Sequence, residues 1–202
     1  KARLPTITGP VSAMDHFLPH DYRVAQATTD KPLKVTIPGP MTIGDTVADS
    51  YYGDEKKRGQ ELATALNAEV LALAEAGCQH IQVDDPLFAR KAEAALDFGI
   101  DNLERVFHGC PESVTRTMHM CCGYPDCLDD TDYPKAPKES YLSLAKAIDA
   151  SSIAAVSLED AHRHNDLSLL EMFERTTVIF GVVAIASSRI ETVEEIRQRL
   201  EA

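Results

Sequence analysis

The longest helical pattern in the chain covers residues 54–76. Its apolar residues recur every three or four positions, while the positions between them are largely polar or charged. Gly77 follows at the point where helices commonly end in a left-handed conformation. The pattern therefore predicts an amphipathic helix that ends at Gly77. The residues of its apolar stripe are Leu62, Leu66, Val70 and Leu73.

Short runs rich in β-branched residues alternate with helical segments along the rest of the chain. Strands are predicted at 6–8, 35–37, 78–84, 115–123, 153–160 and 177–185. Further helices are predicted at 88–107 with an interruption at Gly99, and at 140–148, 167–173 and 191–200. Residues 124–138 are rich in Asp and Pro and form a loop. This alternation calls for a parallel sheet with right-handed crossovers.

One short pattern occurs twice, thirty residues apart. Thr-Ile, one residue and Gly-Pro end the strand-like runs at residues 6–10 and 36–40. Each copy is followed by a hydroxyl residue, Ser12 or Thr42, which we expect to cap the next helix after the turn. Turn chemistry accounts for both copies, so a structural role is favoured over a binding role.

The positions of acids and of metal-type donors favour a barrel over an open sheet. Asp84, the pair His119 and Cys121, and Glu159 lie at the carboxyl ends of three different predicted strands. A (β/α)8 TIM-type barrel brings such ends to one rim. A complete barrel needs about 250 residues. We therefore expect residues 1–202 to be one catalytic barrel domain of about six βα units, without its first and last strands.

Composition and charge narrow the function classes. A formal net charge of -12 argues against nucleic acid, because phosphate binding needs a basic face. The longest apolar run, residues 178–186, is less than half of a membrane span, so no membrane association is expected. Five cysteines, an odd number, and no signal-peptide pattern fit a reducing cytoplasm. No Gly-rich nucleotide-binding motif follows a strand.

His119 and Cys121 are the strongest candidates for chemistry. At positions i and i+2 of a strand they point to the same face, about 7 Å apart along the backbone. Imidazole and thiolate are zinc-type donors, although a buried cysteine beside a hydrogen-bonded core histidine explains the pair equally simply. Asp84 and Asp85 end the preceding strand before a proline, and either acid is as well placed to cap a turn as to bind a ligand.

Five motifs, taken in order, resemble the C-terminal catalytic barrel of cobalamin-independent methionine synthase. They are Gly39-Pro40-Met41-Thr42, Ile81-Gln82-Val83-Asp84, His119-Met120-Cys121, Leu158-Glu159 and the Gly181 strand followed by Val193-Glu194-Glu195-Ile196. The resemblance implies a zinc-dependent methyltransferase that methylates homocysteine. It implies that zinc is bound by His119, Cys121 and Glu159, and that Asp84 holds the substrate amino group. The family's fourth zinc ligand, a cysteine on its last strand, is expected outside this chain, and Cys127 is a poor substitute because its loop cannot hold tetrahedral geometry.

Two departures from the family concern the methyl donor. The chain has no Trp, with Thr46 near the place where the family stacks one on folate, and Ala186 stands where the family has a proton-donating His. These changes resemble relatives such as epoxyalkane:coenzyme M transferase, which alkylate another thiol. His162 and His164 are the remaining candidates for the proton donor, against the simpler interpretation of solvated loop histidines.

Two other classes of function remain open from the sequence. A zinc hydrolase would use a metal-bound water with Asp84 or Asp160 as base, although a thiolate ligand favours a sulfur substrate. A barrel remnant without enzymatic activity is the third hypothesis, because the fourth ligand is not among these residues.

Overall fold

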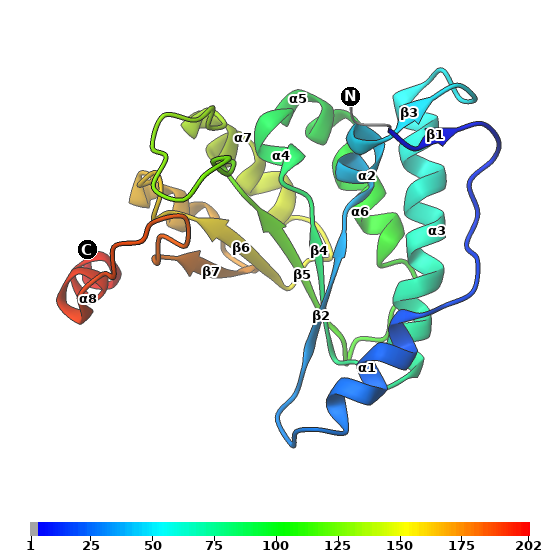
Figure 1. Cartoon of the computed structure of the whole chain (residues 1–202), viewed down its shortest axis with the longest axis horizontal. Coiled ribbons are helices and arrows are strands. Elements are labelled where there is room, and N and C mark those ends of the chain that lie inside the picture. Colours follow the sequence, from blue (N-terminus) through cyan, green and yellow to red (C-terminus); the bar gives the residue numbers. More distant parts are fainter. Residues whose placement is uncertain (1–3) are drawn as a thin grey trace.

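The protein is described by a computed structural model that covers residues 4–202. Its main sheet has five parallel strands in the order β2-β4-β5-β6-β7 (Figure 1). The strands are β2 (Lys34–Pro38), β4 (His80–Asp84), β5 (Thr115–Met120), β6 (Ala155–Glu159) and β7 (Thr177–Gly181). Such a parallel α/β arrangement was predicted from the alternation of strand and helix patterns.

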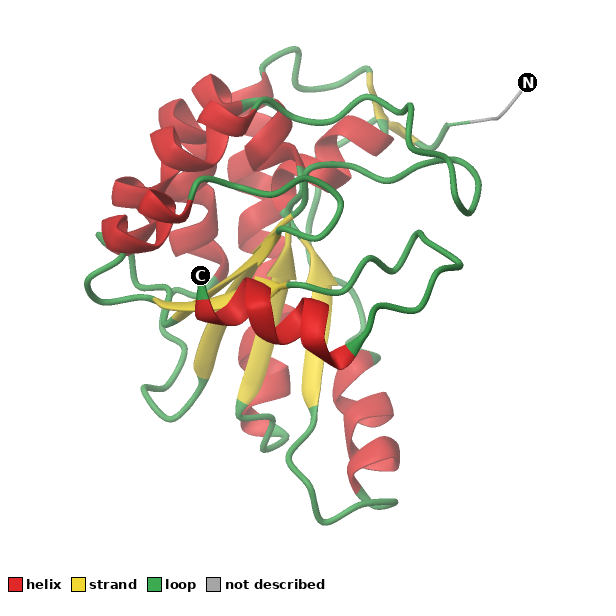
Figure 2. Cartoon of the chain, turned by 90° about the vertical axis from the view of Figure 1, so that its left-hand side faces the viewer, coloured by secondary structure: helices red, strands yellow, loops and turns green. Residues whose placement is uncertain are grey.

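Helices connect consecutive strands and pack mainly on one face of the sheet. They are α1 (Leu18–Gln26), α2 (Pro40–Thr46), α3 (Glu55–Glu75), α4 (Leu87–Arg90), α5 (Ala92–Ala94), α6 (Ile100–Val106), α7 (Lys138–Asp149) and α8 (Val193–Glu201). A π-helical turn, η1 (Ala95–Gly99), and a 3-10 helix, η2 (Leu167–Met172), complete the set. Helix α8 stands apart from the others, in front of the sheet in Figure 2. Within residues 4–202, none of the helices combines the length and the apolar character needed to cross a membrane.

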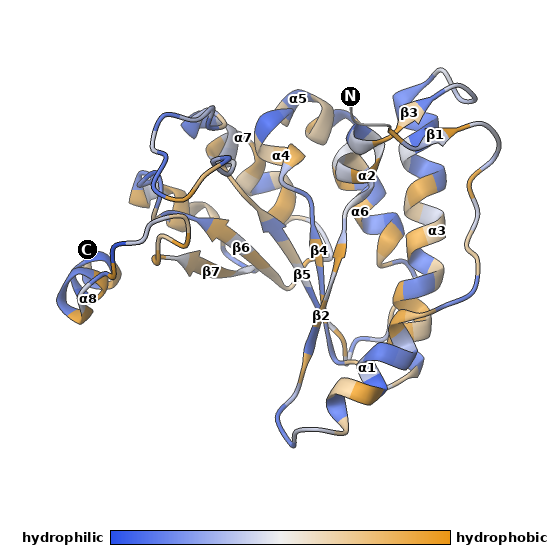
Figure 3. Ribbon diagram, in the orientation of Figure 1, coloured by the Kyte–Doolittle hydropathy of each residue, from blue (hydrophilic) through white to orange (hydrophobic). Residues whose placement is uncertain are grey.

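The strands present two chemically different faces. Side chains at alternate positions, such as Ile81, Met118 and Val156, are fully buried and join the helices in one hydrophobic core. Figure 3 shows the matching alternation of apolar and polar residues along α3. Burial of this apolar face is the main stabilising contribution to the fold, at roughly 25 cal/mol per Å².

The other face of the sheet carries polar residues in aligned rows. The strand register places Thr36, Gln82 and Thr117 in one row. Asp84, His119 and Ser157 occupy the next row toward the carboxyl ends of the strands. The polar residues therefore share one face of the sheet, and they continue to its carboxyl edge, where the functional site was predicted.

The predicted elements differ from the structure in several places. The first strand-like run is shortened to β1 (Thr6–Ile7), which pairs with β3 (Ala48–Asp49) in a separate two-stranded sheet. The main sheet therefore has five strands, not the six expected. The helical region 88–107 is broken at Lys91, and η1 ends at Gly99, where an interruption was expected. Gly77 has φ +96°, which confirms the predicted end of the long helix.

The repeated Gly-Pro pattern enters a helix only in its second copy. Gly39 is the N-cap of α2, and Pro40 occupies the first helical turn, where a missing N–H costs nothing. After the first copy the chain runs on without regular structure, and α1 begins at Leu18 with Phe17 as its N-cap. The expectation that Ser12 caps a helix was therefore wrong.

Helix α2 is capped by a residue distant in sequence. The buried carboxylate of Asp85 accepts hydrogen bonds from Met41 N and Thr42 N, both at 3.0 Å, and from Thr42 Oγ1 at 2.7 Å. Thr42 thus binds the capping carboxylate and is not itself the cap, contrary to the prediction. Burial raises the pKa of Asp85 to about 6, although these hydrogen bonds act to lower it. Asp85 joins the end of β4 to the start of α2.

Candidate functional site

The predicted site residues lie at the carboxyl edge of three neighbouring strands. Asp84 on β4 aligns with His119 on β5, and His119 aligns with Ser157 on β6. Glu159 ends β6, and Cys121 follows directly after β5. The structure therefore brings the residues named from the sequence to one edge of the sheet.

His119 is held between its two neighbouring strands. Its Nδ1 lies 3.0 Å from Ser157 Oγ. Burial alone would lower the pKa of His119, but interactions with Cys121 and the negative charge of Asp84 outweigh burial and raise it. The pKa of the imidazole is thus set by a thiol on its own strand and by a carboxylate on the neighbouring one.

Two adjacent cysteines, Cys121 and Cys122, follow directly after β5, and both are buried. A hydrogen bond from Cys122 lowers the pKa of Cys121 most strongly, with further lowering by His119 and the backbone of Gly123. Gly123 N donates to Cys121 Sγ at 3.4 Å, from a backbone with φ +129° that favours glycine. Cys121 is therefore the thiol of this pair that is stabilised as thiolate.

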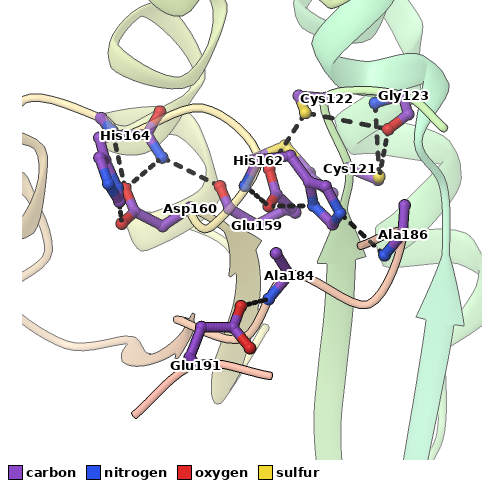
Figure 4. A network of polar contacts seen from close by, with 12 residues as sticks. Cys121, Cys122, Gly123, Glu159, Asp160, His162, His164, Ala184, Ala186 and Glu191 are labelled. Atoms are coloured by element: carbon purple, nitrogen blue, oxygen red, sulfur yellow. Dashed lines mark hydrogen bonds and ion pairs between the residues drawn. The ribbon is translucent and has the colours of Figure 1, made fainter. Parts of the chain in front are cut away.

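Glu159 uses both of its carboxylate oxygens within a local network (Figure 4). Oε2 accepts from Cys122 Sγ at 3.0 Å, and Oε1 accepts from His162 N at 2.7 Å and lies 2.8 Å from His162 Nδ1. The hydrogen bond with Cys121, burial and the charge of Glu159 raise the pKa of Cys122, which therefore stays a thiol.

His162 connects this network to the segment after β7. Its Nε2 accepts a hydrogen bond from Ala186 N at 3.1 Å (Figure 4). Since Nε2 accepts, the ring proton must be on Nδ1, where it is donated to Glu159. The His162 ring thus lies against the backbone of Ala186, the residue that stands where the resemblance gave the family a proton-donating histidine.

The second candidate histidine does not join the site. His164 Nδ1 lies 3.1 Å from Asp160 Oδ2, and its side chain is 67% exposed. Asp160 is fully buried and pairs through both oxygens with Arg199 on α8, at 2.7 and 2.9 Å. Asp160 therefore anchors α8, and this pairing leaves it no free oxygen to act as a base.

The two acids after β4 have separate roles. Asp84 Oδ1 accepts from Gln82 Nε2 at 2.6 Å on the polar face of the sheet. Asp85 points to the other side, where it caps α2. The sequence left capping and ligand binding equally open for both residues, and the structure gives the capping role to Asp85.

The sequence analysis missed three tyrosines around the cysteines. The pKa values of Tyr124, Tyr133 and Tyr141 are raised by burial and by the negative charges of Cys121 and Glu159. Two of them lie in the predicted loop, which the structure ties to the site through Ala136 N and Cys122 O at 2.7 Å. Aromatic residues in an otherwise Asp- and Pro-rich loop were the available signal.

The donor types at this edge suit zinc, but the side chains are not gathered around one point. Within the described part of the chain, no group of three or more His, Cys, Asp and Glu side chains is arranged to hold a metal ion. The Glu159 carboxylate is engaged by Cys122 and His162, whereas His119 contacts Ser157. Cys127 is exposed on its loop.

Comparison with known proteins identifies one family. The family described as "Cobalamin-independent synthase, Catalytic domain" matches residues 1–202. The structure is similar to that of a B12-independent methionine synthase from Shewanella sp. W3-18-1 in complex with selenomethionine, with a TM-score of 0.89 and 32% identity over 99% of this chain and 59% of that one.

Curated relatives give the same result at lower identity. The methionine synthase of Pyrococcus furiosus is 28% identical over 93% of this chain and 49% of the relative. The 5-methyltetrahydropteroyltriglutamate–homocysteine methyltransferase of Lactiplantibacillus plantarum is 28% identical over 98% of this chain and 25% of the relative. The chain thus spans about half the length of the archaeal relatives and a quarter of the bacterial one.

Proposed function

The chain belongs to the family of cobalamin-independent synthase catalytic domains, and on this basis we propose that the protein methylates homocysteine to methionine. The observation that carries the proposal is the strand register that sets Asp84 beside His119, with Cys121 two residues further along the same edge. This register supports a site in which one small amino acid meets Asp84 with its ammonium group and the His119 and Cys121 side with its sulfur.

We propose that the site uses zinc, with His119, Cys121 and Glu159 as its ligands. Imidazole, thiolate and carboxylate are an established zinc donor set, and the lowered pKa of Cys121 favours the thiolate that a metal requires. When bound, zinc would supply the acidification that lets the substrate thiol react as thiolate. A ligand role for Glu159 requires its carboxylate to exchange a contact with Cys122 or His162 for the metal.

The residues of this chain supply binding and orientation for the transfer. Asp84 would hold the substrate ammonium group. The substrate sulfur would form a bond to the methyl carbon while the bond between that carbon and its donor breaks, and the donor would take up a proton. His162 cannot give its Nδ1 proton to the donor without breaking its hydrogen bond to Glu159. This arrangement favours a positioning role for His162.

A second candidate function is alkylation of another thiol. It is favoured by Ala186, which meets His162 through its backbone and carries no side chain that can transfer a proton. The chain also has no Trp. The methyl donor and the acceptor thiol are therefore the parts of the proposal to test first.

The test uses the full-length protein loaded with zinc. L-homocysteine is supplied with 5-methyltetrahydropteroyltriglutamate, and methionine is measured by mass spectrometry. A parallel reaction supplies an epoxide with 2-mercaptoethanesulfonate. We expect methionine in the first reaction and at least a 100-fold loss in His119→Ala, whereas Cys127→Ser, altered at an exposed thiol, keeps its activity. A thioether product in the second reaction alone would favour the alternative, and no product in either would refute both.

Zinc binding is tested separately from turnover. We expect about one zinc ion per chain in the purified full-length protein, lost in His119→Ala and Cys121→Ser and kept in Cys127→Ser. Metal content is measured by mass spectrometry of the desalted protein. Equal zinc in all four proteins would contradict the ligand assignment.

A further inference from the structure

A chain of hydrogen bonds crosses the polar face of the sheet and ends at Asp84. Lys34 Nζ, at the start of β2, donates to Gln82 Oε1 at 2.5 Å. Gln82 Nε2, in the middle of β4, donates to Asp84 Oδ1 at 2.6 Å. The three residues thus connect the amino end of the sheet to its carboxyl edge.

The two partners of Gln82 fix its amide in one orientation. The Lys34 ammonium group can only donate, so it must face the amide oxygen. The Asp84 carboxylate can only accept, so it must face the amide nitrogen. Both partners demand the same orientation, and a flipped amide would lose both hydrogen bonds. Gln82 is only 8% exposed, so water cannot easily replace either partner.

The chain of hydrogen bonds leaves one oxygen of Asp84 available. Within residues 4–202, Oδ1 accepts from Gln82 while Oδ2 has no hydrogen-bond donor. Asp84 also aligns with His119, two positions before Cys121. Rotation of the carboxylate is therefore restrained by Gln82, and Oδ2 is left to accept a hydrogen bond from a substrate.

We propose that Lys34 and Gln82 are positioning residues that give Asp84 its selectivity for the α-ammonium group of an amino-acid substrate. This inference rests on the proposed function and deepens it. A carboxylate held by a charge-assisted donor chain can direct its second oxygen at a fixed distance from the thiol-binding end of the site. Substrates with both a thiol and a correctly spaced ammonium group are then bound, and thiols without the ammonium group are rejected.

The test compares substrates that differ only in the amino group. Binding of L-methionine and of methylthiobutanoate, which lacks the amino group, is measured by calorimetry on the full-length protein. Turnover of homocysteine and of mercaptobutanoate is measured in parallel. In Gln82→Leu, which removes both hydrogen bonds at similar volume, we expect KM for homocysteine to rise roughly 10- to 100-fold with kcat changed less than about threefold.

Three further variants separate positioning from folding. Lys34 is exposed, so Lys34→Met leaves the core intact and is expected to raise KM for homocysteine about three- to tenfold. Lys34→Arg, which keeps a cationic donor, is expected to restore most of that loss. Thr36→Val is the matched control, because Thr36 is paired with Gln82 in the strand register but takes no part in this chain.

Each outcome decides the matter. Selectivity for the amino group that falls in Gln82→Leu and in Lys34→Met, but not in Thr36→Val, establishes the positioning role. Unchanged selectivity in Gln82→Leu, or an equal loss for both members of a substrate pair, overturns the role while the proposed function stands. Failure of the wild-type protein to bind or methylate any amino acid overturns the proposed function and this inference together.

Discussion

Adding a single Cβ atom at Gly39 is expected to lower the stability of the fold strongly. A Cβ placed there would lie 2.2 Å from Asp85 Oδ2 and 2.5 Å from Asp85 Cγ, far inside van der Waals contact. The backbone of Gly39 has φ -79°, which any residue adopts, so the expected penalty is purely steric. Gly39→Ala therefore tests how firmly Asp85 is held at the start of α2.

The size of the effect follows from what Asp85 would lose. Asp85 is fully buried and has three hydrogen bonds from Met41 and Thr42, so it cannot move without breaking the cap. Overpacking costs about 1–3 kcal/mol, and a lost N-cap costs about 0.5–2 kcal/mol. We expect a loss of roughly 2–4 kcal/mol, or a Tm lower by about 5–15 °C for a domain of this size.

Gly9→Ala provides a matched control in the same local sequence. Gly9 precedes a proline in the first copy of the motif, and nothing lies within 4 Å of the position of its Cβ. Thermal unfolding of the full-length protein should leave this variant within about 1 °C of the wild type. The Gly39 effect should also shrink in an Asp85→Ala background, because the clashing carboxylate is then gone. Equal Tm values for Gly39→Ala and Gly9→Ala would refute the argument.

Two further predictions concern buried carboxylates. The pKa of Asp85 is raised to about 6 from an ordinary value of 3.8, so between these pH values the folded state keeps a proton that the unfolded state releases, and this contribution to stability is lost as pH rises. Urea unfolding at pH 4 and pH 6.5 should therefore show wild type losing roughly 2 kcal/mol relative to Asp85→Asn, and a pH-independent difference would contradict it. Arg199→Met should release α8, which buries no side chain of its own and is held by the paired Asp160. Hydrogen exchange in residues 193–201 should accelerate roughly 10- to 100-fold while α3 stays unchanged, and equal exchange in α8 would argue against the anchor.

The parts of the fold that could be predicted are those that follow from the periodicity of apolar residues or from the order of the strands. The stripe of α3 and its end at Gly77 follow from a period of 3.6 residues, and the gathering of Asp84, His119 and Glu159 at one edge follows from parallel strands. Strand β1 was misassigned because a two-residue run of Thr6 and Ile7 satisfies the local pattern but has no place in the main sheet. Pairing partners distant in sequence decide such short runs.

The site was predictable in its residue types but not in its contacts. The cap on α2 comes from Asp85, more than forty positions away, and no local motif indicates it. The contact of His162 could not be predicted either. Its ring accepts a hydrogen bond from the backbone N–H of Ala186, and the identity of residue 186 does not indicate that bond. Side chains that bind distant main-chain groups are invisible to motif analysis, because the partner group is present at every position.

The placement of His162 makes the loop over the site sensitive to a single proton. Its Nε2 accepts from Ala186 N, while Ala186 O accepts from Asp129 N at 2.9 Å and Ser188 N donates to Asp129 Oδ1 at 2.6 Å. A second proton on the imidazole would turn that acceptor into a donor and leave the Ala186 N–H without a partner. The single hydrogen bond that His162 accepts thus helps to fix the segment after β7, which in turn holds the loop at Asp129.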